Sequence, residues 1–235
     1  MGKLAMPKID LVIFDCDGVL VDSEYLAAQI ESQLLTDSGF EISPEELAER
    51  YAGLIFIDIL KEIEKQSTIP LSASLVDRVP ELFRSRMANE LQAIDGVRAA
   101  VQSVAEKYPY CLCSNSKSAD IKNMLTTVAL YDLFEDRIYS APEVGTKKPK
   151  PAPDVYLYAA EKMKANPKNT IVIEDSIHGV RGATAAGMRV IGFTGGSHAY
   201  PGLADALTEA GAETVISRHS NLAAVLDAMA QWRDD

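Results

Sequence analysis

The sequence predicts an α/β protein with a doubly wound parallel sheet as its core and an all-helical cap domain inserted after the first strand. Two observations carry this prediction. Short apolar runs such as Ile9–Phe14 are typical of strands buried on both faces, and after Gly96 such runs alternate with helical patterns. Residues 23–90, in contrast, have helical periodicity and no convincing strand.

The helical region begins soon after the first strand. A helix is expected from about Ser23 to Ser38, because Gly39 is a residue type that commonly follows the end of a helix. Ser43 and Pro44 predict the start of another helix, with serine as the N-cap and proline at the first helical position. The pattern then stays helical to about Glu90. Two breaks are expected, near Gly53 and Pro70.

The second part of the chain alternates between the two types of element. The predicted strands are Tyr110–Cys113, Arg137–Tyr139, Thr170–Ile173, Arg189–Phe193 and Thr214–Ile216. The predicted helices are Val97–Lys107, Asp120–Val128, Asp154–Lys164, Ile177–Ala186, Leu203–Ala210 and Leu222–Trp232. We therefore expect a core domain of residues 1–22 plus 91–235 and a cap domain of residues 23–90. Hinges between them are expected at Asp22–Ser23 and in Glu90–Asp95.

The composition argues against several classes of partner. The net charge of −11 leaves no broad basic surface for nucleic acid, whose binding rests on neutralising phosphates. No apolar run approaches the roughly 18 residues of a membrane span, and the N-terminus lacks a signal-peptide pattern. Three cysteines, an odd number, lie in apolar runs and favour reduced thiols. We expect a cytoplasmic protein without nucleic-acid or membrane partners, and the sequence leaves its oligomeric state open.

Polar side chains follow three of the predicted strands at the point where each strand ends. Asp15 and Asp17 follow the first strand, Ser114 and Asn115 the next, and Glu174-Asp175 a third. Ligands of doubly wound sheets bind at this edge. Carboxylates gathered there would raise one another's pKa unless a cation compensated, and oxygen ligands together with phosphate point to Mg²⁺.

This pattern indicates phosphoryl transfer. Asp15 is placed to attack phosphorus and form an aspartyl-phosphate, and Asp17 to protonate the leaving oxygen and later deprotonate water. Gly18 lets backbone N–H groups turn toward the phosphate. Ser114 and Asn115 offer it hydrogen bonds, and a lysine balances its charge. Each feature also has a structural alternative, since the acids suit an ordinary turn, Ser114 suits a helix cap and the lysines suit a solvated surface.

The motifs resemble, in the correct order, the four motifs of the haloacid dehalogenase (HAD) superfamily, and the resemblance spans the whole chain. They are FDCDGVLVDSE at 14–24, Ser114, KPAPDVY at 150–156, and Glu174-Asp175-Ser176 with Gly179 and Ala186-Gly187-Met188. The resemblance implies a Rossmann-like core with a helical cap of the β-phosphoglucomutase or phosphoglycolate phosphatase type. It also implies metal ligation by the Asp15 carboxylate, the Asp17 backbone carbonyl and Asp175, with Glu174 as a further ligand or a holder of bound water.

Two differences from members of that superfamily favour hydrolysis. The dehalogenases lack the second acid, which is present here as Asp17. The sugar-phosphate mutases carry a His and an Arg in the cap, where this chain has Ala27 and Phe56. We expect a Mg²⁺-dependent phosphoric monoester hydrolase that acts on a small phosphorylated metabolite through an aspartyl-phosphate. A β-phosphoglucomutase-like mutase and a non-catalytic metabolite-binding module are the alternatives.

The lysine of the third motif is ambiguous, because Lys148 and Lys150 both precede a proline. We favour Lys150, whose spacing to Asp154 and Tyr156 fits a helix start better. The predicted catalytic residues are Asp15, Asp17, Ser114 and Lys150. The predicted phosphate-binding residues are Gly18, Ser114, Asn115 and Lys150, and the predicted metal ligands are Asp15, Asp17, Glu174 and Asp175. The apolar segment Ala52–Ile57 favours a small or less polar leaving group.

Overall fold

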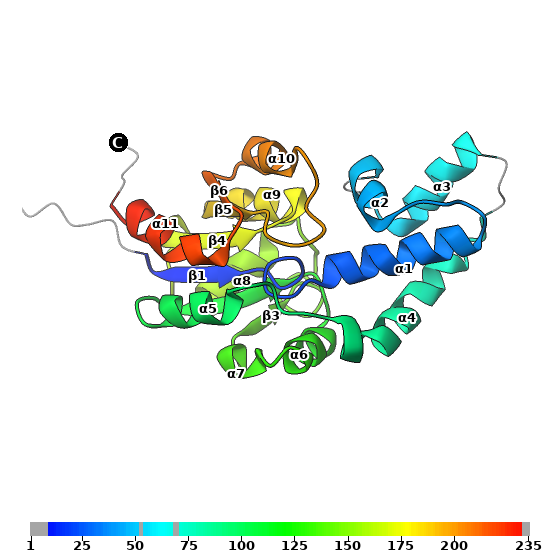
Figure 1. Cartoon of the computed structure of the whole chain (residues 1–235). Helices are drawn as coiled ribbons and strands as arrows, with labels where there is room; N and C mark the ends of the chain where they lie inside the picture. Colours follow the sequence, from blue (N-terminus) through cyan, green and yellow to red (C-terminus); the bar gives the residue numbers. More distant parts are fainter. Residues whose placement is uncertain (1–8, 52–53, 68–70, 232–235) are drawn as a thin grey trace, which may run out of the picture.

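The computed structural model describes residues 9–51, 54–67 and 71–231 (Figure 1). Its core is a parallel sheet of six strands in the order β3-β2-β1-β4-β5-β6, which confirms the predicted fold class. The strands are β1 Leu11–Phe14, β2 Tyr110–Ser114, β3 Ile138–Ser140, β4 Thr170–Glu174, β5 Arg189–Phe193 and β6 Thr214–Ile216. Phe14 of β1 pairs with Leu112 of β2 and with Ile173 of β4, so the carboxyl ends of these three strands meet at one edge.

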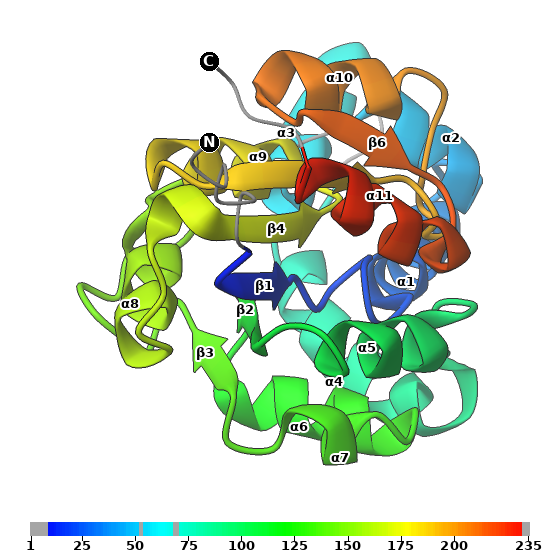
Figure 2. The same cartoon turned by 90° about the vertical axis from the view of Figure 1, so that its left-hand side faces the viewer.

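Helices cover both faces of the sheet (Figure 2). Successive side chains of a strand point to opposite faces, and accordingly Val12 and Phe14 of β1 lie in one core cluster while Leu11 and Ile13 lie in the other. The first cluster includes residues of α5 Val97–Ala105, α6 Ser118–Thr127, α7 Tyr131–Phe134 and α11 Leu222–Met229. The second includes residues of α8 Asp154–Lys162, α9 Ile177–Ala185 and α10 Leu203–Ala210.

Four further helices lie together beyond the carboxyl edge of the sheet (Figure 1). They are α1 Ser23–Asp37, α2 Pro44–Arg50, α3 Phe56–Gln66 and α4 Leu75–Glu90. The described residues between 23 and 90 contain no strand. The Ser43 side chain accepts a hydrogen bond from the Glu46 N–H, the N-cap contact expected at the start of α2. The two segments that join these helices to the sheet run side by side, since the Asp22 N–H donates to the Gln92 carbonyl oxygen.

Several element bounds differ from the prediction. Helix α6 begins at Ser118 rather than Asp120, and α7 was not predicted, because four residues are too few for a periodic pattern. The predicted breaks at Gly53 and Pro70 and the C-terminal residue Trp232 lie outside the described residues. Two short 3₁₀ segments, Pro167–Asn169 and His219–Asn221, complete the secondary structure of the described residues. Among the helices described, none combines the length and hydropathy that a membrane span requires.

Candidate active site

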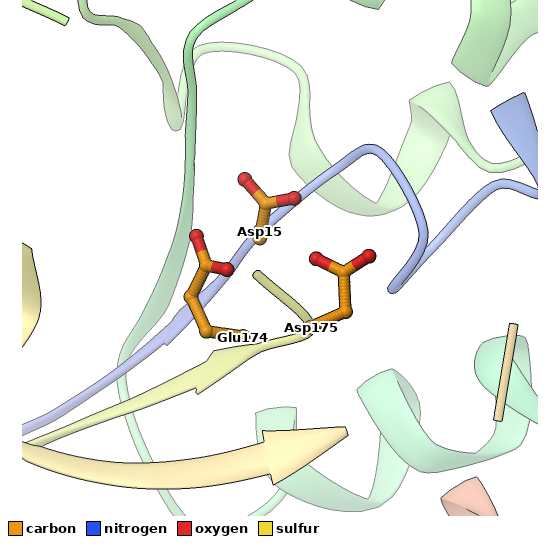
Figure 3. A group of neighbouring side chains, drawn as sticks. All are labelled: Asp15, Glu174 and Asp175. Atoms are coloured by element: carbon orange, nitrogen blue, oxygen red, sulfur yellow. The ribbon is translucent and has the colours of Figure 1, made fainter. Parts of the chain in front are cut away.

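Three carboxylates meet at the carboxyl edge of the sheet (Figure 3). Asp15 directly follows β1, Glu174 is the last residue of β4, and Asp175 follows it. All three are buried, and one oxygen atom of each lies within 4.8 Å of the others. Because β1 and β4 are neighbours in register, residues about 160 positions apart necessarily end at the same place.

Lys150 provides the positive charge of this cluster. Its Nζ atom lies 2.5 Å from Asp15 Oδ1, 2.7 Å from Glu174 Oε1 and 2.9 Å from the Cys113 carbonyl oxygen. Burial alone would lower the pKa of Lys150, but the two carboxylates reverse this and raise it well above its ordinary value. Lys148, the other candidate for the motif lysine, is exposed to solvent.

The charge balance of the cluster fits a hard divalent cation. Burial raises the pKa of Asp15 and of Asp175 well above the ordinary value for aspartate, and the neighbouring carboxylates raise it further. Three ionised carboxylates and one ammonium would leave two negative charges uncompensated. A divalent ion with oxygen ligands matches this deficit in both charge and ligand type.

Glu174 has both carboxylate oxygens occupied by donors from the protein. Oε1 accepts hydrogen bonds from Lys150 Nζ and from Tyr156 Oη at 3.0 Å. Oε2 accepts bonds from the N–H and the hydroxyl of Ser176, at 3.0 and 2.9 Å. These contacts hold the carboxylate and the lysine in fixed positions. The two roles that the resemblance implies for Glu174, a further metal ligand or a holder of bound water, both remain predictions.

Asp17 lies beside the cluster, in a different environment. Its Oδ1 accepts a hydrogen bond from the Ser23 hydroxyl at 2.8 Å, and its Oδ2 accepts bonds from the hydroxyls of Ser114 and Ser116 at 3.0 and 2.9 Å. Three hydroxyl donors therefore fix the orientation of a carboxylate that is only partly buried. Ser23 and Ser116 received no role in the sequence analysis, and only their convergence on Asp17 indicates one.

Residues at the end of β2 connect Asp17 to the segment that carries Lys150. Ser114 is fully buried at the end of β2, and besides donating to Asp17 its hydroxyl accepts a bond from the Ser116 N–H at 2.9 Å. The Asn115 side-chain oxygen accepts a bond from the Lys150 N–H at 2.8 Å. Asn115 thus holds the backbone that carries Lys150, and its contact with phosphate remains a prediction.

Two glycines provide the space for the acidic side chains. Gly18 has φ +75°, and a Cβ atom there would lie 1.8 Å from Asp175 Oδ2. A Cβ atom at Gly179 would lie 1.8 Å from Glu174 Oε1. The backbone therefore approaches both carboxylates so closely that no side chain fits.

His198 is a site neighbour that sequence reasoning did not identify. It lies in the segment between β5 and α10, and its Nε2 atom is 3.0 Å from Asp175 Oδ2. Burial lowers its pKa. No motif marks this histidine, whereas His178, which lies beside Glu174-Asp175-Ser176 in the sequence, is exposed to solvent.

Similarity to known proteins agrees with this geometry. A family model described as haloacid dehalogenase-like hydrolase matches residues 12–193. The 6-phosphogluconate phosphatase of Escherichia coli (strain K12) is 28% identical over 200 residues, covering 83% of this chain and 87% of the relative. Hexitol phosphatase B of the same strain is 32% identical over 188 residues, covering 78% and 83%. A conserved haloacid dehalogenase-like protein from Agrobacterium tumefaciens str. C58 has a solved structure with 52% identity and a TM-score of 0.90, covering 94% of this chain and 99% of that one.

Proposed function

Because the chain belongs to the haloacid dehalogenase-like hydrolase family, we propose that it is a Mg²⁺-dependent phosphatase of small phosphorylated metabolites. The single observation that carries this proposal is that Asp15 and Asp17, two positions apart in the sequence, lie in different environments. Asp15 lies among Lys150, Glu174 and Asp175, where an anionic group needs a cation. Asp17 lies just outside, held by three hydroxyl groups.

These positions support a reaction in two steps. Asp15 attacks phosphorus in line, so that an Asp15–phosphorus bond forms while the ester bond breaks, and Asp17 gives its proton to the leaving oxygen. Water then attacks the phosphorus while Asp17 takes a proton from the water. The bond between phosphorus and the Asp15 carboxylate breaks, and inorganic phosphate is released. When bound, the divalent cation supplies the charge neutralisation that lets an anionic phosphate approach an anionic carboxylate.

The remaining site residues position these groups. We propose that Asp15, the Asp17 backbone carbonyl and Asp175 hold the cation, and that Glu174 fixes Lys150, which contacts the phosphate. Ser114 orients Asp17 through the bond from its hydroxyl. The left-handed conformation of Gly18 turns the chain so that neighbouring backbone N–H groups can face the phosphate, while its own N–H donates to the Val21 carbonyl oxygen.

We also propose that residues 23–90 act as a cap over the core formed by residues 1–22 and 91–235. The paired segments around Asp22 and Gln92 would be the hinges, and closure would exclude water during transfer. The three cysteines are buried free thiols, which supports a reducing, cytoplasmic setting.

The choice of hydrolysis over a mutase reaction rests on the cap. Ala27 and Phe56, at the positions where mutases carry His and Arg, line a cavity of about 390 Å³ between α1, α3 and the His198 segment. Neither side chain can dock a phosphate. The names of the two Escherichia coli relatives support a substrate of the sugar- or polyol-phosphate type.

A panel of esters tests this function. With Mg²⁺, we expect release of inorganic phosphate from p-nitrophenyl phosphate and from at least one of 6-phosphogluconate and glucitol 6-phosphate. The nucleophile is tested by a variant. Asp15→Asn should lower kcat by at least about a thousandfold without unfolding the protein, since the nucleophile is lost. The wild type should form a phosphoenzyme that hydroxylamine cleaves, and the variant should not. An isomerised sugar phosphate without free phosphate would instead support the mutase alternative, and full activity of Asp15→Asn would exclude Asp15 as nucleophile.

A further inference from the structure

The cavity next to Asp17 is the place where a leaving group must lie if Asp17 protonates it. This open cavity has a volume of about 260 Å³ and is lined by residues of α1, α4 and α6. Asp17 and Ser116 line it at the edge of the sheet, and Asn123 lines it from α6. Its size is near the lower end of ligand pockets, roughly 300 Å³, and favours the leaving group of a small metabolite.

Helix α4 presents one continuous face to this cavity. The face consists of Val79, Pro80, Phe83, Arg84 and Met87, at positions i, i+1, i+4, i+5 and i+8. Residues at this spacing lie on one side of a helix. A face that only packs against neighbours is expected to be apolar throughout, but here a single arginine stands among four apolar side chains.

Arg84 is also free to bind a ligand. In the part of the chain that the structure describes, it has no ion pair and no hydrogen bond, whereas Arg86 on the same helix pairs with Glu90. No other lysine or arginine among the described residues lines the cavity. The carboxylates of Asp17, Glu24 and Asp120 line it too, yet none lies within 4.0 Å of the Arg84 guanidinium.

We propose that Arg84 is a specificity-determining residue that binds a carboxylate on the leaving group, so that the preferred substrates are phosphate esters of small hydroxy acids. This inference rests on the proposed phosphatase function and names its substrate class. A guanidinium matches a carboxylate with two parallel hydrogen bonds. Arg84 is exposed to solvent, so its guanidinium is accessible to a bound substrate.

Two esters that differ in one group test the proposal. 6-Phosphogluconate carries a carboxylate where glucitol 6-phosphate carries a hydroxymethyl group, and the rest of the carbon chain is the same. The value of kcat/KM with Mg²⁺ is measured for both esters in the wild type, Arg84→Gln, Arg84→Lys and Arg78→Gln. Arg78 is the matched control, because it is an exposed arginine of the same helix that has no ion pair among the described residues and does not line the cavity.

We expect the wild type to prefer 6-phosphogluconate. Arg84→Gln should lower kcat/KM for 6-phosphogluconate by about 10- to 100-fold, mainly through KM, because a charge-assisted bond to the bound substrate is lost. The same change should leave glucitol 6-phosphate within about twofold, Arg84→Lys should be intermediate, and Arg78→Gln should behave as the wild type.

Three results would overturn the proposal. One is a wild type that hydrolyses p-nitrophenyl phosphate but does not prefer 6-phosphogluconate. Another is an unchanged ratio between the two esters in Arg84→Gln. The third is an equal loss on both esters, which would mean that Arg84 only latches the cleft, for example through Asp120. All three leave the phosphatase function standing, whereas a wild type without activity on any ester would contradict the function itself and this inference with it.

Discussion

Lys150 Nζ lies 2.5 Å from Asp15 Oδ1, although 135 positions separate the two residues in the sequence. The same ammonium group also contacts Glu174, and all three side chains are almost completely buried. The Lys150 ammonium therefore neutralises charge on two buried carboxylates, and the stability of the site depends on it.

Removal of the Lys150 ammonium should lower both the stability of the protein and its activity. We expect Lys150→Met to lower the free energy of unfolding by about 3–5 kcal/mol, reduced to the extent that Asp15 takes up a proton, because buried carboxylates lose their counter-charge. Activity should fall by at least about a hundredfold. Urea unfolding and kcat measurements check this, with Lys148→Met as the matched control. A larger loss of stability and kcat in Lys148→Met than in Lys150→Met would identify Lys148 as the lysine of the third motif.

A divalent cation should stabilise the protein as well as activate it. Removal of metal with a chelator should abolish turnover, and Mg²⁺ at about 100 times its Kd should add about 2.7 kcal/mol to the free energy of unfolding. Asp175→Asn should lose most of this stabilisation, whereas Asp205→Asn, an exposed aspartate of α10, should keep it. Thermal unfolding with and without Mg²⁺ measures the effect. The same Mg²⁺-induced rise in Tm for Asp175→Asn as for the wild type would exclude Asp175 as a ligand.

Two glycines with the same backbone conformation should respond differently to alanine. Gly18 and Gly187 have φ +75° and +74°, so both changes carry a similar strain of about 1–2 kcal/mol. A Cβ atom at Gly187 meets nothing within 4 Å, but at Gly18 it would displace the Asp175 carboxylate.

Gly187→Ala should therefore lower Tm and leave the Mg²⁺ requirement unchanged. Gly18→Ala should lower Tm at least as much and also raise the Mg²⁺ concentration needed for half-maximal activity by about tenfold or more, as changes around metal ligands commonly do. Activity measured against Mg²⁺ concentration in both variants distinguishes the effect of backbone strain from that of displacing the Asp175 carboxylate. Equal Mg²⁺ requirements would mean that Asp175 adapts freely.

Glu31 should make stability depend on pH. Burial, and after it the neighbouring Glu24 carboxylate, raise its pKa from 4.5 to about 8. Between pH 4.5 and about 8 the folded state holds a proton that the unfolded chain has released, so this residue's contribution to stability falls as the pH rises through that window.

Glu31→Gln should remove this dependence. We expect the variant to gain up to a few kcal/mol over the wild type above pH 8, since one pKa unit corresponds to about 1.4 kcal/mol, and to gain little near pH 4.5. Urea unfolding at pH 6 and pH 9 measures the difference, with Glu49→Gln, an exposed glutamate of α2, as the control. A gain that is the same at both pH values would show that Glu31 titrates normally.

The parallel sheet and the residues at its edge could be predicted from the sequence because their signals are local. Apolar runs mark the strands, and the residue after each run must lie at the carboxyl edge, as Asp15 and Asp175 do. Helix α7 lacked such a signal because it is only four residues long.

By itself, the sequence determined the fold class, the order of the motifs and the acidic residues of the site. Only the tertiary structure decided which of two lysines reaches Asp15, that His198 contacts Asp175, that Ser23 and Ser116 hold Asp17, and that Arg84 faces the cavity beside it. The physical reason is that periodicity and turn residues report the conformation of a few neighbouring residues. Contacts between loops of different strands depend on how the whole chain packs, which no local pattern encodes.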